Sequence, residues 1–182
     1  MQRSHSDASA QSPRSDAEAL KARIITEAKA RGAVDVRVTD AVTDEELRAR
    51  LRASFERGDL STWPYDERYA RAASDPDTVL AGARSIVCLA VPYATAPVRR
   101  APLHGRVSNY AWSEDYHHRM RALLREIAAI VDELAGARVT AIACDTKPIA
   151  ERAFAARAGL GWVGKHTNLI SPRGGSYVFL GS

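Results

Sequence analysis

Residues 85–91 read Ser-Ile-Val-Cys-Leu-Ala-Val, and this stretch decides the class of fold. Its segment from Ile86 to Val91 is the longest uninterrupted apolar run in the chain. A short run without polar alternation is typical of a strand in a sheet that is covered on both faces. We therefore expect a central strand here, with other elements packed on each side of it.

The sequence before this strand predicts a helix, a strand and a second helix. Capping boxes at Ser15–Glu18 and Thr43–Glu46 each indicate the start of a helix. The two helices are expected to end before Gly32 and Gly58, because glycine favours helix termination. Alternation of valine with polar residues over 34–38 predicts a strand between them.

The sequence after residue 58 adds a long loop and more alternating elements. Residues 59–83 are polar, and only a short helical turn near Asp75–Pro76 is expected within them. The later predictions are an amphipathic helix over 116–134, a strand over 138–144, a helix over 148–158, and a hairpin of 167–170 with 177–180. Interleaved helices and strands predict an α/β or mixed α+β fold, layered as a sheet-and-helix sandwich.

The length of 182 residues indicates one domain, which we expect over residues 15–182 after a flexible polar tail at residues 1–14. No apolar stretch approaches the roughly 18 residues that a transmembrane helix needs. The beginning of the chain also lacks the apolar segment of a signal peptide. The sequence therefore predicts a cytoplasmic protein with no membrane partner.

Positive charge is concentrated near the end of the chain. Residues 146–182 contain five basic residues and one acidic residue, an excess equal to the net charge of +4 of the whole chain. Such a concentration favours a phosphate-bearing partner, either a nucleotide-like cofactor or a nucleic acid. An ordinary solvated surface is equally compatible with it.

The only cysteines, Cys88 and Cys144, both lie in apolar runs. Two cysteines are too few for a disulfide scaffold, for a cysteine-based zinc site or for an iron–sulfur cluster. We expect both to be inert thiols in the core.

Residues 159–166 read Gly-Leu-Gly-Trp-Val-Gly-Lys-His, which contains the G-x-G-x-x-G string of dinucleotide-binding folds and nearly matches a P-loop. Both motifs require a strand before the glycines and a helix after them, so that the helix N-terminus meets the phosphates. Here the sequence predicts a helix before the glycines and a strand after them. The stretch is better interpreted as a glycine loop that ends in Lys165 and His166.

Asp145 is the carboxylate of greatest chemical interest, because it follows the apolar run that ends at Cys144. A partly buried acid at the end of a strand can hold its proton near neutral pH and act as a general acid. The alternative is a structural role, as an Asx-turn or N-cap before the helix expected near Pro148. The residues alone leave both roles open.

Other combinations give weaker indications. His117 and His118 are adjacent and point about 100° apart on a helix, so they do not favour a shared metal, and no metal ligand is assigned. No serine lies in a G-x-S-x-G elbow. Tyr110, Trp112 and Tyr116 could stack on a base or a macrocycle, although core packing is the commoner role of such aromatic residues.

In this order, several segments resemble the epoxyqueuosine reductases, which act on tRNA in the last step of queuosine synthesis. They are Leu80–Val87, then Gly105–Arg106 through Asp115–His117, then Asp145–Thr146 to Ala156–Thr167, and Gly175–Gly181. The third of these segments gives the most specific resemblance.

The resemblance implies a cobalamin-binding domain similar to that of reductive dehalogenases, with base-off cobalamin as cofactor and two [4Fe–4S] clusters that deliver electrons. The implied reaction reduces the epoxide of epoxyqueuosine, at the wobble position of the tRNA anticodon, to the cyclopentene of queuosine and releases water. The implied partners are the tRNA, cobalamin and an electron donor, and we expect a monomer.

The resemblance also implies roles for individual residues. Asp145 matches the proton donor of the family and adjoins the cofactor, which favours its role as a general acid. The positions expected to line the corrin are Ser108, Thr167, Leu169 and Leu180. The positions expected to contact phosphate or tRNA are Arg152, Arg157 and Lys165.

The sequence departs from the family pattern after Gly181, where the family continues into a cysteine-rich ferredoxin-like module and helical repeats. With Ser182 and two isolated cysteines, the chain is expected to be a truncated or shortened homologue that binds cobalamin weakly and does not turn over alone. The alternative is a stand-alone corrinoid- or RNA-binding module without redox activity. A nucleotide-binding enzyme is disfavoured by the order of elements around Gly159.

Overall fold

The structure is a computed structural model that describes residues 13–182 except 60–61, 95–102, 104 and 106. Its centre is an antiparallel sheet in the order β1-β2-β5, formed by β1 (Asp35–Asp40), β2 (Ser85–Pro92) and β5 (Val178–Gly181). The predicted central strand is thus confirmed, with a neighbour on each edge. The fold is the expected mixture of helices and sheet.

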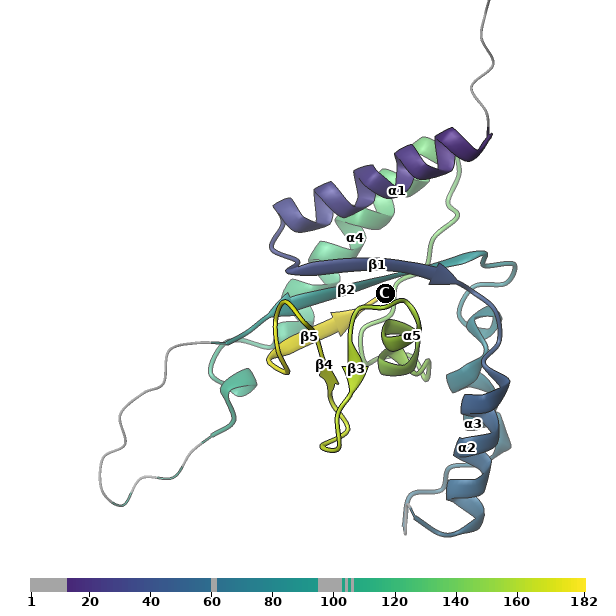
Figure 1. Cartoon of the computed structure of the whole chain (residues 1–182), viewed down its shortest axis with the longest axis vertical. Coiled ribbons are helices and arrows are strands. Elements are labelled where there is room, and N and C mark those ends of the chain that lie inside the picture. The colour runs from purple at the N-terminus through teal and green to yellow at the C-terminus, as the bar shows by residue number, and fades with distance from the viewer. Residues whose placement is uncertain (1–12, 60–61, 95–102, 104, 106) are drawn as a thin grey trace, which may run out of the picture.

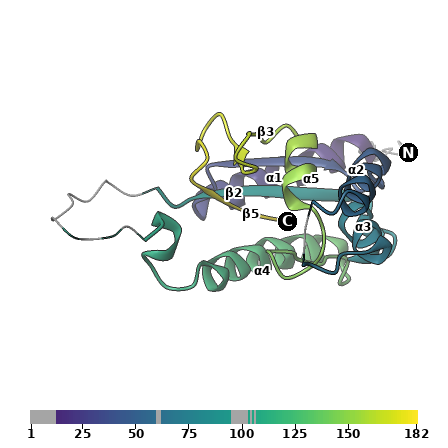
Figure 2. The same cartoon turned by 90° about the horizontal axis from the view of Figure 1, so that it is seen from below.

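Helices α1 (Pro13–Ala30) and α4 (Tyr116–Ala135) cover one face of this sheet, and α5 (Glu151–Arg157) lies on the other (Figures 1 and 2). Alternate residues of β2 supply the two core clusters. Leu89 and Val91 pack with α1 and α4, whereas Cys88 and Ala90 pack with α5. Both faces of β2 are buried, which explains its uninterrupted apolar sequence.

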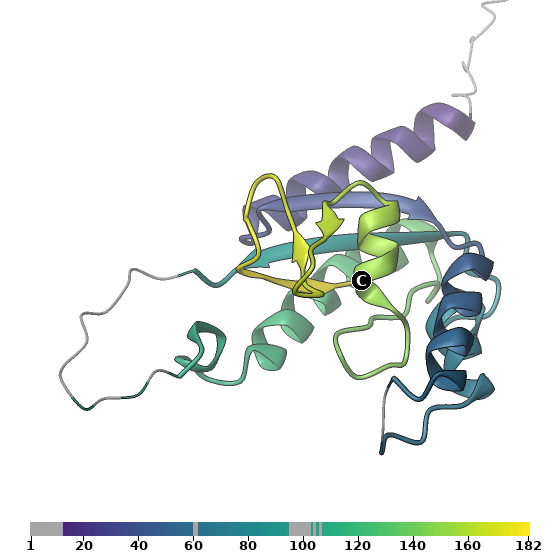
Figure 3. The ribbon, with the colours of Figure 1, turned by 60° about the horizontal axis from the view of Figure 1, so that its bottom comes forward.

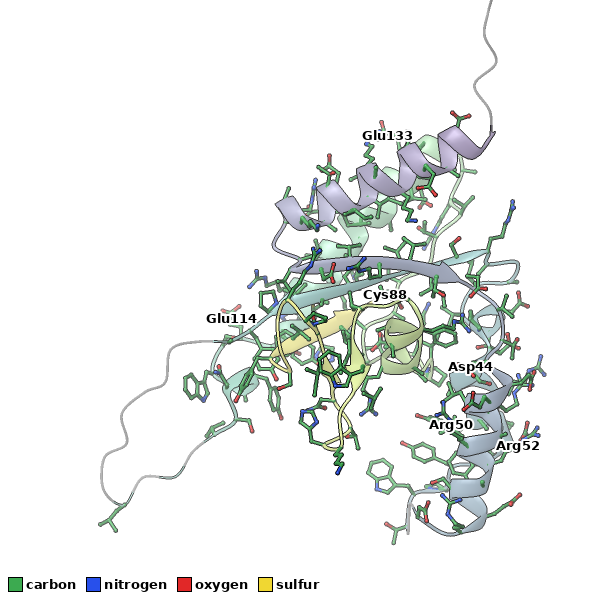
Figure 4. All side chains as sticks on the ribbon, viewed as in Figure 1. Asp44, Arg50, Arg52, Cys88, Glu114 and Glu133 are labelled. Atoms are coloured by element: carbon green, nitrogen blue, oxygen red, sulfur yellow. The ribbon has the colours of Figure 1, made fainter. Side chains whose placement is uncertain are left out.

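Two further helices, α2 (Glu45–Glu56) and α3 (Glu67–Ser74), stand side by side at one end of the sheet. Figure 4 labels Arg50 and Arg52 on α2, away from Cys88 at the sheet. The Arg52 guanidinium pairs with the Glu67 carboxylate of α3. The remaining elements are the turns η1 (Pro76–Thr78) and η2 (Asn109–Ala111), and a small antiparallel pair of β3 (Trp162–Val163) with β4 (Leu169–Ile170).

The helix starts differ from the predictions. Helix α1 begins at Pro13, so Ser15 is already helical, and the rest of the predicted tail lies outside the described residues. Helix α2 is capped by Asp44, whose carboxylate accepts the N–H of Leu47, and the hydroxyl of Thr43 donates instead to Asp75. Aspartate is at least as good an N-cap residue as threonine, and α2 is therefore capped one residue later than predicted.

Helix α3 was missed inside the long loop predicted over residues 59–83. Asp66 caps it by accepting the N–H of Tyr69, and its buried face consists of the small residues Ala70, Ala73 and Ser74. The helix spans only eight residues and its buried face has small side chains, so it did not stand out within an otherwise polar segment. The helical turn predicted near Asp75–Pro76 is confirmed as η1.

The C-terminal half contains three corrections. The strand predicted over 138–144 is absent, and only Ala143 exchanges backbone hydrogen bonds, with Ser182. The helix predicted from Pro148 begins three residues later, at Glu151. The predicted hairpin of 167–170 with 177–180 does not form, because β5 extends the central sheet while β4 pairs with β3.

Among the described residues, no helix combines the length and the apolar character needed to cross a membrane.

The close approach of β3 to β4 gives a test of the fold. A Cβ added at Gly161 would lie 2.1 Å from the carbonyl oxygen of Ile170, whereas one added at Gly105 would have no atom within 4 Å. We expect Gly161→Ala to lower the free energy of unfolding by about 1–3 kcal/mol, because the backbone must shift. Urea denaturation measures this, with Gly105→Ala as the control. Equal stability of the two variants would contradict the packing described here.

Candidate active site

Asp145 lies in the connection between α4 and α5, which Figure 3 draws as a green loop leading into α5. Its backbone has a φ of 50°, in the left-handed region that aspartate tolerates better than most residues. Its carboxylate accepts a hydrogen bond from the hydroxyl of Tyr116, the first residue of α4. The turn therefore brings this acid next to the beginning of a long helix.

The carboxylate of Asp145 is 59% exposed, so the expectation of a partly buried acid was wrong. The alternative role as a helix cap is also not observed. Ala150 occupies the N-cap position of α5, and no side chain caps that helix. The contact of Asp145 with Tyr116 is a long-range one, which sequence spacing could not reveal.

Tyr116 belongs to a ladder of stacked rings that crosses from α4 to the sheet. Its ring lies parallel to that of Phe179 in β5, with centroids 4.0 Å apart, and Phe179 stacks on Tyr93 at 4.3 Å. His117 stacks on the other side of Tyr116 at 4.1 Å, and Tyr177 lies beside Tyr93. This ladder fixes the position of the Tyr116 hydroxyl.

Burial raises the pKa of Tyr116, and the hydrogen bond and negative charge of Asp145 raise it further. The phenol therefore keeps its proton and donates to Asp145. The imidazole of His117 contacts the same carboxylate, with Nε2 3.9 Å from Oδ2, and its Nδ1 lies 2.6 Å from the carboxylate of Asp115. Asp115 caps α4 by accepting the N–H of His117, which holds the ring at the site.

Glu151 is a site residue that the sequence analysis missed. Its Oε2 accepts the backbone N–H of Asp145 at 3.4 Å, and its buried Oε1 has no hydrogen-bond partner. Burial, reinforced by the negative charge of Asp145, raises the pKa of Glu151 to about 7. In the sequence this residue looks like an ordinary acid in the first turn of a helix, and only the fold buries it.

The side chain of Glu151 lines a cavity of about 10 Å³, together with Cys88, Phe154 and Leu180. Cys88 and Cys144 are free and buried, as expected of core thiols. Burial raises the pKa of each thiol to about 12, which keeps both protonated.

The glycine loop has the order of elements that argued against a nucleotide site, because α5 precedes it, β3 lies within it and β4 follows it. Two of its glycines serve the chain itself. Gly161 is in contact with the backbone of Ile170, and a Cβ at Gly164 would lie 2.5 Å from the ring of His166. These contacts account for Gly161 and Gly164, so a bound phosphate is not needed to explain why glycine occupies the two positions.

The residues expected to line the corrin are spread over different environments. Leu169 is 2% exposed in the core cluster on the α5 face, and Leu180 packs against the same cluster. Ser108 is exposed at the beginning of η2. Thr167 has a φ of 68°, and its carbonyl accepts a hydrogen bond from Arg152.

Of the three cations expected to meet phosphate, Arg157 is already engaged within the chain. Its guanidinium donates to the carbonyls of Asp40 and Val42 and lies over the ring of Phe154, 4.6 Å from the centroid. Arg152 donates to Thr167, and Lys165 is exposed. The structure thus leaves Lys165 as the most accessible of the three.

The aromatic residues of the segment before α4 do not form a core. Tyr110 is 50% and Trp112 44% exposed, and the indole N–H of Trp112 donates to the carbonyl of Val107. Of the three aromatic residues singled out in the sequence, only Tyr116 is packed into the ladder. Within the described residues, no group of three or more His, Cys, Asp or Glu side chains could hold a metal ion.

A groove of about 960 Å³ lies elsewhere, between α1, α4 and residues 138–143. None of the residues predicted for the site lines it. The site around Asp145 is instead an open surface beside the aromatic ladder.

In sequence and in structure, the chain is similar to known proteins of one family. The family model "Epoxyqueuosine reductase QueG, DUF1730" matches residues 74–146. The chain is 39% identical over 143 residues to an epoxyqueuosine reductase of Gloeobacter violaceus, covering 78% of this chain and 43% of that protein. It is 31% identical over 177 residues to one of Bacillus anthracis, covering 91% and 44%. The chain thus spans less than half the length of these relatives.

Solved structures agree with the sequence matches. The epoxyqueuosine reductase of Streptococcus thermophilus superimposes with a TM-score of 0.74 at 26% identity, over 88% of this chain and 44% of that one. An epoxyqueuosine reductase solved with an epoxyqueuosine-modified tRNA-Tyr stem loop gives 0.73 at 28% identity, over 90% and 44%. The enzyme of Bacillus subtilis, solved with its catalytic aspartate loop swung out of the active site, gives 0.70 at 26%, over 90% and 44%.

The burial of Glu151 predicts a pH-dependent stability. The pKa of about 7 in the folded chain lies above the ordinary value of 4.5, so folding favours the protonated acid. Its contribution to stability is complete below pH 4.5 and is lost as the pH rises through 7, by about 3 kcal/mol in total. We expect urea denaturation between pH 5 and 8 to show this loss in the wild-type chain and not in the Glu151→Gln variant.

The control for this experiment is Glu18→Gln, which alters an exposed acid of α1. Its stability should follow the pH dependence of the wild-type chain. A wild-type and a Glu151→Gln chain with parallel pH dependence would show that Glu151 titrates normally.

Proposed function

Because the chain is related in sequence and fold to the epoxyqueuosine reductases, we propose that it forms the catalytic domain of such an enzyme, over residues 15–182. The proposed reaction reduces the epoxide of epoxyqueuosine in tRNA to the alkene of queuosine. The observation that carries the proposal is the pairing of Asp145 with Tyr116 within segments that resemble the family. The relative solved with a modified tRNA stem loop supports tRNA as the substrate.

The chemistry of this reaction requires an acid. Removal of the epoxide oxygen consumes two electrons and two protons, and it yields the alkene and water. Asp145 is exposed, so it can reach a substrate, and we assign to it the transfer of a proton to the departing oxygen. Tyr116 and His117 hold its carboxylate in place from α4.

Cobalamin is the proposed cofactor, and when bound it supplies the reducing electrons at cobalt. A planar corrin would pack against an apolar surface of the protein. The aromatic ladder, which runs from Tyr93 through Phe179 and Tyr116 to His117, offers apolar ring edges beside Asp145, so the residues present fit the group. The proposed contacts from this chain are Ser108, Asp145, Thr167, Leu169 and Leu180.

The substrate also carries phosphates. We assign phosphate contacts to Lys165 and Arg152, and we place Arg157 last among the three cations because its guanidinium is bound to the end of β1. A tRNA substrate supports a cytoplasmic location.

A corrinoid- or RNA-binding module without redox activity is the second candidate. It is favoured by the buried state of both cysteines, which leaves this chain without ligands for a [4Fe–4S] cluster. Electrons would then reach the site only from a partner that carries the clusters. Both candidates bind a corrinoid or RNA, and only the first carries out the reaction.

Binding of cobalamin is the first experiment. We expect hydroxocobalamin mixed with the chain to co-elute with it on gel filtration, as measured by corrinoid absorbance. Replacement of an aromatic ladder ring, Phe179→Ala, should weaken this co-elution. Binding of ATP or NAD without any corrinoid would contradict both candidates.

Replacement of Asp145 tests the proposed acid. Turnover is measured on an epoxyqueuosine-modified stem loop, in a chimaera in which this chain replaces the matching part of the Streptococcus thermophilus enzyme. We expect Asp145→Asn to lower kcat by about 100-fold or more while corrinoid binding is retained, because the amide has no proton to give. The matched control is Asp16→Asn, in the first turn of α1. Normal turnover of the Asp145→Asn chimaera would remove this role.

A further inference from the structure

Asp145 and Glu151 form a pair of carboxyl groups on the two sides of one loop. The N–H of Asp145 is donated to Oε2 of Glu151, and the side chain of Asp145 also interacts with that of Glu151. The second oxygen of Glu151 is buried without a partner. A buried carboxyl oxygen without a partner is costly, and in a folded protein it calls for an explanation.

In the part of the chain that the structure describes, no positive charge compensates Glu151. The titratable groups that face it are Cys88 of β2, Cys144 and Asp145 of the preceding segment, and Tyr116 of α4. Among the described residues, none of the groups that alter its pKa is a cation. The imidazole of His117 contacts only the outer carboxylate of this pair, with Nε2 3.9 Å from Oδ2 of Asp145. Two adjacent carboxyl groups tend to hold one proton between them.

The two acids occupy different environments. Asp145 is open to solvent and accepts the hydrogen bond of Tyr116, an arrangement suited to a carboxylate. Glu151 lies against the apolar side chains of Phe154 and Leu180, an arrangement suited to a neutral acid. Where two adjacent acids differ in this way, one commonly holds a proton while the other carries charge.

We propose that Glu151 holds the proton that Asp145 delivers to the departing oxygen, acting through Asp145 as a positioning and proton-storing residue. The inference rests on the proposed function of Asp145. An O–H bond of Glu151 breaks as one forms on the carboxylate of Asp145, which passes the proton to the substrate oxygen. Glu151 is left as a carboxylate and regains its proton from water between turnovers.

The first test is direct and independent of turnover. Carbon-13 NMR of the glutamate side-chain carboxyl groups follows the protonation of Glu151 in the chain, and Glu151→Gln identifies its signal. We expect a midpoint near pH 7 that falls in Asp145→Asn, because the neighbouring negative charge is gone. A midpoint near 4.5, or one that Asp145→Asn leaves unmoved, would overturn the inference.

The second test uses the pH profile of the chimaera. In the wild type, kcat should fall as the pH rises through about 7, where the stored proton is lost. In Glu151→Gln, kcat at pH 6 should fall about tenfold or more and this limb of the profile should disappear, although the amide oxygen can still accept the N–H of Asp145. Glu151→Asp should restore the limb in part, and Glu18→Gln should leave the profile unchanged.

The two tests separate failure of the inference from failure of the proposed function. An inactive wild-type chimaera would count against the proposed function, and the NMR midpoints would then decide the Glu151–Asp145 coupling alone. Unchanged kcat and pH profile in Glu151→Gln would overturn the inference while leaving Asp145 as the acid. Because Asp145 is exposed, Asp145→Asn keeps the fold and the first test stays decisive even if Glu151→Gln fails to fold.

Discussion

Burial of β2 on both faces is the constraint on which the rest of the structure depends. Its side chains alternate between two core clusters, one with α1 and α4 and the other with α5. The strand also needs a partner on each edge, because a buried backbone N–H or C=O without a partner is costly. Strands β1 and β5 supply those partners. Helices α4 and α5 are therefore fixed on opposite faces of one strand.

The site is a consequence of this arrangement. Helix α4 supplies Tyr116 and the loop before α5 supplies Asp145, and they meet beside β5, where Phe179 supports the Tyr116 ring. The same loop turns Glu151 inward against the sheet. The two acids thus have opposite exposure although they are close in sequence, and this difference gives each a different chemical use.

An exposed aspartate alone is a weak proton store at neutral pH, since its ordinary pKa is near 4. Under the proposed function, a buried acid next to Asp145 would hold the proton while the outer carboxylate stays exposed. The phenol of Tyr116 completes the arrangement by holding the outer carboxylate.

The sequence by itself determined the elements with strong periodicity and the residues within family-like segments. The apolar run of β2, the alternation of β1 and the stripe of α4 were all predictable, because burial on a defined face leaves a period in the sequence. Asp145 was also identified, through its place after an apolar run and through the resemblance. The order of elements around Gly159, which argues against a nucleotide loop, was also deduced from the sequence.

Only the tertiary structure decided how distant segments pair. Three features depend on contacts between distant segments, which the local sequence pattern does not specify. They are the pairing of β5 with β2, the absence of a strand over 138–144, and the short helix α3. The exposure of Asp145 and the burial of Glu151 are also decided by tertiary structure, because the sequence does not distinguish an exposed acidic residue from a buried one. Burial is a property of what packs against a residue, and that is decided by the whole chain.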